Sequence, residues 1–305
     1  MKIRCGRLKK ALIPWLFLAP SLGGVAVFVG IPFLDVMKRS FTDTMGKRFT
    51  GLKNYRAVLE NPAFQLAAGN TARFLAVCIP LLMTVSLGLA LLISGRTEKE
   101  KKNTVIKNCR TVLVLPMAVP TASMVLVWKM ILCGDGILNQ FLSWLTGNLW
   151  EVDWAFSGYA FPVLIVTYLW RHVGYDMILW LAGLQGIPGE QYEAARIDGA
   201  GGAARFWYIT VPGLKGTLGM VGILSVVNSF RVYREAYLLA GSYPDASIYL
   251  IPHLFAHWFL SLDIQKMTAA AVMMTGIFVL PAAAWGFHKR RRQGVCQVDT
   301  DDRKS

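Results

Sequence analysis

Ionisable side chains that lie in otherwise apolar sequence are the first candidates for chemistry. Arg171, His172 and Asp176 interrupt a hydrophobic stretch of the chain. A charge at the centre of a membrane helix costs about 2.5–3.5 kcal/mol, so such residues usually face protein or water. We therefore expect Arg171 to line a polar path, where it would bond solute hydroxyls. The alternatives are an ion pair with a neighbouring chain, or a span that ends elsewhere than predicted. Asn228 is a second candidate for that path.

No pattern in the sequence indicates catalysis or a bound metal. His253 and His257 are four residues apart, but the glutamate of the H-E-x-x-H pattern is missing, so we interpret both as ordinary histidines near the membrane surface. The five cysteines form no C-x-x-C pair. Neither a nucleophile elbow nor the phosphate-binding pattern G-x-x-x-x-G-K-[ST] occurs. We predict a chain that is not an enzyme and has no cofactor.

The elements that must position these residues are long apolar helices. Of the 305 residues, 54% are hydrophobic and only 16% are charged, whereas soluble domains carry about 25% charged residues. Residues 11–34, 74–94 and 267–287 contain no charge. The first of these stretches would be about 36 Å long as a helix, more than the ~30 Å hydrocarbon core. The composition excludes a soluble enzyme, a fibrous protein and a disordered chain, and it predicts an all-α integral membrane protein.

The hydrophobic pattern predicts six transmembrane helices. Their expected ranges are 11–34, 71–94, 111–132, 155–184, 214–231 and 267–287. The first apolar run follows a basic N-terminus as in a secretory signal, but it is longer than the 7–15 apolar residues of a signal, so we interpret it as a retained span.

The distribution of basic residues predicts that both termini are cytoplasmic. Of the 32 Lys and Arg residues, 20 fall in the stretches 1–10, 95–110, 185–215 and 288–305, which lie on one side if the N-terminus is inside. The loop 35–70 would lie outside and carries six basic residues, which is against the rule. The reverse orientation would place the 20 basic residues outside, so the assignment holds. We attribute the net charge of +14 to this topology and expect no nucleic-acid partner.

Residues 186–212 predict a helix–turn–helix at the cytoplasmic surface. Pro188 suits a first helical turn, and Glu190 and Glu193 lie near the positive end of the helix dipole. Gly199 can adopt a positive φ and end this helix, after which a second short helix can follow. Small alanines would allow another surface to approach closely, so we interpret the segment as a docking element.

The spacing in this segment resembles the EAA loop in permease subunits of bacterial ABC importers: E-A-A, three residues, G, nine residues, I-x-L-P. Asp198 belongs to an I-D-G-A sequence that is similar to the carbohydrate branch of the family. The residues that match the loop, with Val211 in place of Leu, are Glu193, Ala194, Ala195, Gly199, Ile209 and Pro212. Further stretches similar to the family are Leu18-Ala19-Pro20-Ser21, Gly51-Leu52-Lys53-Asn54-Tyr55, Asn70-Thr71 and Tyr243-Pro244.

The resemblance, which is nearest to the maltose-permease-like family, implies the type I ABC importer permease fold. It implies three regions: a basic tail, first span and outer loop (1–66), a permease core (67–287) and a basic cytoplasmic tail (288–305). It implies a translocation pathway for a carbohydrate in the bacterial inner membrane. The implied partners are a second permease, two ATPase subunits, an extracytoplasmic solute-binding protein and membrane lipid. Coupling to the ATPases is implied for Glu193, Ala194, Ala195, Asp198, Gly199, Ile209 and Pro212.

The rival interpretation is a secondary transporter driven by an ion gradient. It predicts internal inverted repeats and buried carboxylates near the midplane of the membrane. We find no such repeat, and Asp176 is the one acidic residue within the predicted spans.

Overall fold

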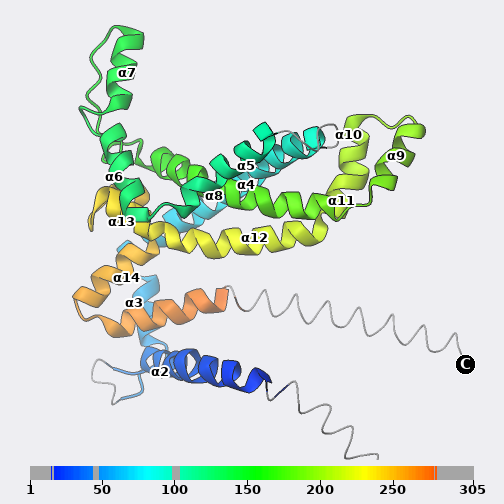
Figure 1. Cartoon of the computed structure of the whole chain (residues 1–305). Helices are drawn as coiled ribbons and strands as arrows, with labels where there is room; N and C mark the ends of the chain where they lie inside the picture. The colour runs from blue at the N-terminus through cyan, green and yellow to red at the C-terminus, as the bar shows by residue number, and fades with distance from the viewer. Residues whose placement is uncertain (1–14, 16, 44–47, 98–103, 278, 280–305) are drawn as a thin grey trace, which may run out of the picture. The chain divides into compact units, whose positions relative to one another are not determined.

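The structure is a computed structural model, and it describes residues 15, 17–43, 48–97, 104–277 and 279. These residues are almost entirely helical, and the β-structure among them is an isolated bridge between Thr42 and Phe49 (Figure 1). The chain divides into two units, Met1–Phe64 with Phe255–Ser305, and Gln65–Leu254, which we describe separately.

The first unit begins with a helix that continues past its predicted end. Residues 17–25 are helical, and the helix passes through a π-helical turn to end at Ser40, whereas the sequence predicted an end at residue 34. Asp35 and Arg39, 2.7 Å apart, form an ion pair in its last turns. Residues 11–14 and 16 of the predicted span lie outside the described residues. The elements here are η1 (Ala26–Gly30), α2 (Ile31–Ser40) and α3 (Lys53–Leu59), followed by α14 (Ile251–Leu260), which crosses the unit boundary, and helical residues 264–277.

Side-chain hydrogen bonds hold the end of α2. The amide of Asn54 donates to the carbonyl oxygens of Ser40 at 2.9 Å and Thr42 at 2.8 Å. The hydroxyls of Tyr55 and Ser40 are 2.7 Å apart. Gly51, with φ of 59°, makes the turn into α3. The segment that resembles the permease family thus closes the polar end of the first helix.

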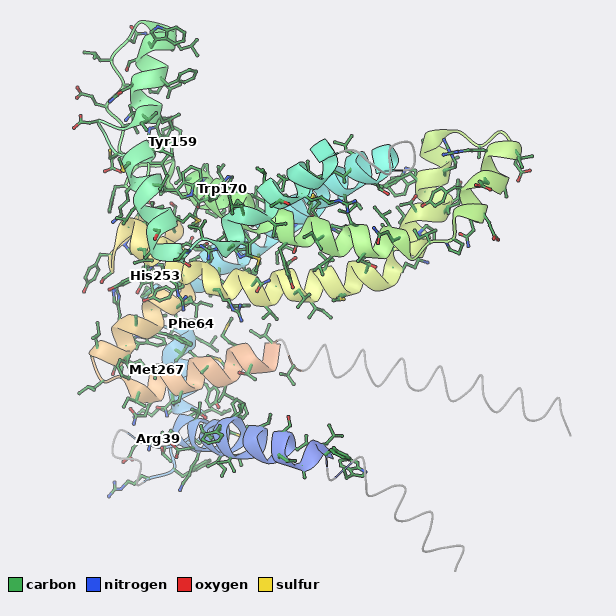
Figure 2. The ribbon with its side chains drawn as sticks, viewed as in Figure 1. Arg39, Phe64, Tyr159, Trp170, His253 and Met267 are labelled. Atoms are coloured by element: carbon green, nitrogen blue, oxygen red, sulfur yellow. The ribbon has the colours of Figure 1, made fainter. Side chains whose placement is uncertain are left out.

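The C-terminal half of this unit is a helical hairpin. α14 ends in a turn in which Leu262 has φ of 59°, and residues 264–277 form the next helix. The ring of Trp258 on α14 stacks against Phe64, with ring centroids 6.4 Å apart (Figure 2 labels Phe64). The predicted span 267–287 is helical up to residue 277, and residues 280–287 lie outside the described part of the chain.

The second unit is built around one buried helix, α8 (Ala160–Gln185), of whose 26 residues 14 are buried. α8 packs against α5 and α12 (Figure 1). The indole of Trp180 donates to the hydroxyl of Ser86 on α4 at 3.0 Å. The other elements are α4 (Pro62–Thr97), α5 (Thr104–Ala118), α6 (Thr121–Leu132), α7 (Ile137–Thr146), α9 (Gly189–Ile197), α10 (Gly202–Arg205), η2 (Phe206–Thr210), α11 (Val211–Gly213), α12 (Lys215–Ser229), η3 (Phe230–Val232), α13 (Tyr233–Ala240) and η4 (Ala246–Ile248).

Two glycines allow the helices around α8 to approach closely. A Cβ at Gly174 would overlap the backbone carbonyl of Leu113 on α5. A Cβ at Gly183 would overlap the side chain of Thr217 on α12. Small residues at such positions let membrane helices gain backbone contact where apolar lipid offers no hydrophobic driving force.

Two predicted spans are interrupted. The span predicted at 111–132 breaks between α5 and α6, because Pro120 is extended at ψ of 135° and the residue before a proline disfavours helical geometry. The span predicted at 214–231 is α12, which turns through η3 directly into α13. α4 is longer than the predicted 71–94, and α8 starts five residues later than the predicted 155–184.

Three helices in the described residues are long and apolar enough to cross a membrane: Phe17–Ser40, Pro62–Ser94 and Thr121–Thr146. A fourth candidate is the pair Gly202–Gly213 and Lys215–Ala240, which is bent by 68°. At 26 residues α8 is about 39 Å long, which suffices to span, but its polar centre lowers its hydropathy. The count of six predicted from the sequence therefore stays a prediction.

Polar contacts fix the loop after α13. The amide of Asn70 on α4 donates to the carbonyl oxygens of Ala246 at 2.6 Å and Tyr249 at 3.0 Å. Asp245 accepts hydrogen bonds from the hydroxyl and the backbone N–H of Ser247, which hold the pKa of this carboxyl below its usual range. The Asn70-Thr71 pair thus anchors a loop that lies far away in the sequence.

Candidate functional site

The segment predicted to dock a partner forms a helix–turn–helix. α9 starts after Pro188 and ends at Ile197. Gly199 then takes φ of 75°, a conformation that a side chain disfavours. Its N–H donates to the carbonyl of Arg196 at 3.1 Å, and the N–H of Ala200 donates to that of Ala195 at 2.8 Å. These bonds satisfy carbonyls at the end of α9 and reverse the chain, as the glycine predicted.

The second leg of this segment runs from Gly202 to Gly213 and contains the π-helical turn η2. The hydroxyl of Tyr192 on α9 lies 2.9 Å from the hydroxyl of Thr210 on η2. Thr210 is buried, so this contact fixes the angle between the two legs. Leu214, also buried, joins this leg to α12.

The outer surface of this helix pair is open. No residue of α9 is buried, and Ile197 and Tyr208 are 88% and 83% exposed. Among the residues matched to the loop, Glu193, Ala194, Asp198, Gly199 and Pro212 are exposed, and Ala195 and Ile209 are partly buried. Figure 1 shows α9 and α10 at one end of the second unit and α7 at the other. The pair therefore presents small, acidic and large apolar side chains together at one end of the bundle.

The residues predicted to line a polar path meet at a cavity of about 480 Å³. Arg171 from α8 and Asn228 from α12 both line it. The other polar lining residues are Thr121, His172, Arg231, Tyr233, Arg234 and Glu235. The volume lies within the range of ligand pockets, about 300–1,000 Å³.

An ion pair organises one wall of the cavity. The Nε of Arg171 lies 3.3 Å from Oε1 of Glu235, and their side chains are 13% and 7% exposed. A guanidinium nitrogen of Arg171 also lies 3.5 Å from the sulfur of Met124. The ion pair lies within this chain, and it accounts for the charge of Arg171 without a neighbouring subunit.

The sequence prediction missed Glu235, Arg231 and Arg234. The signal was present, because these three residues follow i, i+3 and i+4 spacing and so share one helical face. The predicted span ended at Arg231, and the helical continuation through η3 into α13 was not foreseen.

Further polar contacts lie along α8. The hydroxyl of Ser225 on α12 donates to Asp176 at 2.8 Å, and both side chains are buried. The ring of His172 stacks on Tyr168, with centroids 4.1 Å apart. Asp176 therefore holds α8 to α12. Among the described residues, no group of three His, Cys, Asp or Glu side chains could hold a metal ion.

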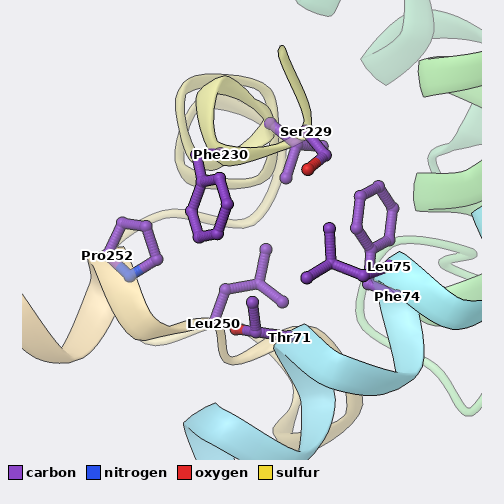
Figure 3. A pocket seen from close by; sticks show the side chains of 8 residues that line it. Thr71, Phe74, Leu75, Ser229, Phe230, Leu250 and Pro252 are labelled. Carbon is purple, nitrogen blue, oxygen red and sulfur yellow. The ribbon is translucent and has the colours of Figure 1, made fainter. Parts of the chain in front are cut away.

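A second, small pocket lies between α4 and the α12–η3 junction. Its volume is about 10 Å³, close to the minimum that holds one water molecule. Phe74, Phe230 and Leu250 line it together with Ser229 and Thr71 (Figure 3). It is too small and too apolar to hold a solute.

His253, one of the two histidines considered as a metal ligand, is part of the core. It is buried, and its Nδ1 accepts the N–H of Leu250 at 3.2 Å. Its ring packs edge-on against Tyr233, with centroids 4.8 Å apart. These contacts give His253 a structural role.

The sequence comparison decides the family. The family described as the inner membrane component of binding-protein-dependent transport systems matches residues 92–291, about two thirds of the chain. The chain belongs to this family. The family consists of membrane permeases, and the apolar helices of the structure agree with a protein embedded in a membrane.

Relatives of this permease are named as sugar transport permeases. It is 29% identical over 277 residues to the arabinooligosaccharides transport system permease protein AraP of Halalkalibacterium halodurans, covering 88% of this chain and 85% of that protein. It is 31% identical over 278 residues to the trehalose/maltose transport system permease protein MalF of Thermococcus litoralis, covering 89% and 91%.

Solved structures share the fold of this permease. A chain of a bacterial ABC transporter involved in the import of the acidic polysaccharide alginate superposes with a TM-score of 0.73 at 21% identity, covering 94% of this permease and 99% of that chain. The same type of transporter, in complex with a periplasmic protein that holds an alginate pentasaccharide, gives a TM-score of 0.74 at 20% identity.

Proposed function

We propose that this permease forms part of the translocation pathway of an ATP-driven importer for a carbohydrate. Membership of the family and the sugar transport permeases among its relatives support the proposal. The observation that carries it is the cavity of about 480 Å³, lined from α5, α6, α8 and the α12–α13 segment, in a helix bundle that ends in an exposed helix pair. Arg171 and Asn228, which line that cavity, would hydrogen-bond solute hydroxyls.

Coupling to ATP hydrolysis would pass through the helix pair 189–213. Its exposed residues Glu193 and Gly199 belong to the E-A-A…G pattern and would meet a separate ATPase chain. The buried Leu214 joins the pair to α12, and α12 ends at the cavity. A displacement of the pair would reach the cavity because a packed helix moves as a rigid element.

The remaining parts of the proposal concern assembly and topology. The pathway would need a second permease and two ATPases, and a solute-binding protein is supported by the neighbouring structure in complex with one. We propose six spans in the bacterial inner membrane with both termini cytoplasmic. A permease core at 67–287 would stand between an N-terminal region at 1–66 and a basic tail at 288–305.

The test is to purify the tagged chain from its native membranes in mild detergent and to identify the chains that accompany it. We expect an ATPase and a second permease. Glu193→Lys should lower ATPase recovery about tenfold, because the substitution reverses the charge at the proposed contact with the ATPase. Glu190→Lys is the matched control, since Glu190 lies on the same helix and outside the E-A-A pattern.

Two results would contradict this proposal: the first would reject the importer function, and the second would reject only the role of Glu193. Recovery of the chain alone, in a stable state that still transports solute, would favour a transporter driven by an ion gradient. Equal loss of the ATPase from both lysine variants would show that the general charge of α9, and not Glu193, governs docking.

A further inference from the structure

The lining of the cavity carries more positive than negative charge. Arg171, Arg231 and Arg234 line it, and Glu235 is the acidic residue among the lining residues. The ion pair at 3.3 Å assigns the charge of Glu235 to Arg171. Within the described residues, no carboxylate forms an ion pair with Arg231 or Arg234. Two guanidinium groups therefore supply positive charge to the cavity.

One of the three arginines, Arg171, lies deep along its helix, and the exposed Arg231 and Arg234 line the same cavity. Arg171 is 14 residues from the Gln185 end of α8 and 11 from its Ala160 end, which is about 21 Å and about 17 Å along the helix axis. A cationic side chain at such depth marks a solute or ion pathway or pairs with an opposite charge, as Arg171 does with Glu235. The cavity that the three arginines line holds space for a ligand.

Both arginines sit on a firmly held element. Arg231 belongs to η3, where Val232 is buried, and Arg234 belongs to α13, where Ala236 and Leu239 are buried. Glu235, between Arg171 and the core, ties α13 to α8. The backbone that carries the two guanidinium groups is thus fixed, which lowers the cost of ordering them around a ligand.

We propose that this cavity selects a saccharide that carries a carboxylate, with Arg231 and Arg234 binding the carboxylate and Asn228 and Thr121 bonding the hydroxyls. Guanidinium groups present donors in a planar fork that matches a carboxylate. A neutral sugar of the same size would leave the charge of both arginines without an opposite charge in the cavity. This inference rests on the proposed function and specifies the substrate class of the same site.

The test compares an acidic sugar with its uncharged ester on the intact complex. The complex purified with the tagged chain is freed of its solute-binding protein, and radiolabelled trigalacturonate and its methyl ester are bound to it. The ester keeps every ring and hydroxyl, removes the charge of each carboxylate and adds a methyl group in its place. We expect the acid to bind about tenfold more tightly or better, and we expect Arg231→Gln and Arg234→Gln to abolish this preference.

Lys129→Gln is the matched control, because it removes one positive charge from an exposed position on α6 that does not line the cavity. It should keep the preference for the acid. Equal binding of acid and ester by the unaltered complex would overturn the proposal. So would an arginine variant that releases the second permease while the preference persists, because the arginines would then pair with that subunit.

Failure of this inference differs from failure of the proposed function. If the complex binds the neutral ester and ATPase chains accompany it, the importer stands and the acidic substrate is wrong. If neither sugar binds and no ATPase accompanies the chain, the proposed function itself is wrong.

Discussion

Arg171 and Glu235 form an ion pair whose side chains are 13% and 7% exposed, so each depends on the other. Removing one partner of a buried pair leaves an uncompensated charge and costs about 3–5 kcal/mol, whereas apolar replacement of both is often tolerated. We expect Arg171→Met to lower the unfolding temperature clearly, and Arg171→Met with Glu235→Met to recover most of the loss. Thermal unfolding in detergent, followed by tryptophan fluorescence, measures this. A double variant as unstable as Arg171→Met would show that the pair is not coupled.

Gly199 is the residue on which the turn between the two legs depends. Its φ of 75° costs other residues about 1–2 kcal/mol, and proline cannot adopt it or donate the N–H that bonds Arg196. We expect Gly199→Pro to insert in the membrane and to lose solute uptake, with a smaller loss for Gly199→Ala. Gly201→Ala is the control, because Gly201 has φ of –67° and open space around its Cα. Normal uptake by Gly199→Pro would contradict a role for this turn.

At the scale of elements, the contact of α8 with α5 and α12 sets the shape of the second unit. A Cβ at Gly174 would meet the backbone of Leu113, which cannot move alone, whereas at Gly183 it would meet the side chain of Thr217, which can rotate. Gly174→Ala should therefore destabilise more than Gly183→Ala. Gly88→Ala on α4 should not destabilise, since nothing lies within 4 Å of its added Cβ and alanine favours a helix over glycine by about 1 kcal/mol.

The same unfolding measurement in detergent ranks these three variants. If Gly174→Ala and Gly88→Ala unfold at the same temperature, the close approach of α5 to α8 does not contribute to stability. The comparison uses the same chemical change at three helical positions, so differences in helix propensity do not explain the ranking.

Local features of the elements were predictable, and contacts between distant segments were not. A glycine after an amphipathic stretch predicted the turn at Gly199, and the apolar runs predicted α8 to within five residues, whereas α4 begins nine residues before its predicted start. The break at Pro120 was missed because proline occurs both at ends and inside membrane helices, as Pro80 does within α4. The partner of Arg171 could not be named, since periodicity does not show which helix packs against α8.

At the scale of the whole molecule, apolar surface is exposed to an extent that water would not tolerate. In the helix Phe17–Ser40, the most apolar 18-residue window has a mean hydropathy of 2.0 and contains no buried residue. Large exposed apolar patches mark contact with lipid or with another protein. Lipid and partner proteins both belong to the environment proposed for this permease, so the exposed apolar surface agrees with that proposal.

The orientation of the molecule in the membrane is the last prediction, and the proposed function depends on it. The 20 Lys and Arg residues assigned to the cytoplasmic side include those around the helix pair 189–213, so an ATPase can reach that pair only if the positive-inside rule holds here. We expect a membrane-impermeant maleimide to label Asn148→Cys in spheroplasts and to label Gln191→Cys only after permeabilisation. Both positions are exposed, and the background lacks the five natural cysteines.

The six basic residues of the loop 35–70 make the reverse orientation the competing arrangement, which this labelling distinguishes. Labelling of Gln191→Cys in intact spheroplasts would place the helix pair outside, where no ATP is available. The reverse orientation would leave the cavity and its arginines as a candidate solute site, but it would exclude a coupling role for Glu193 and Gly199. The measured orientation therefore decides whether the cavity is driven by ATP hydrolysis through the helix pair.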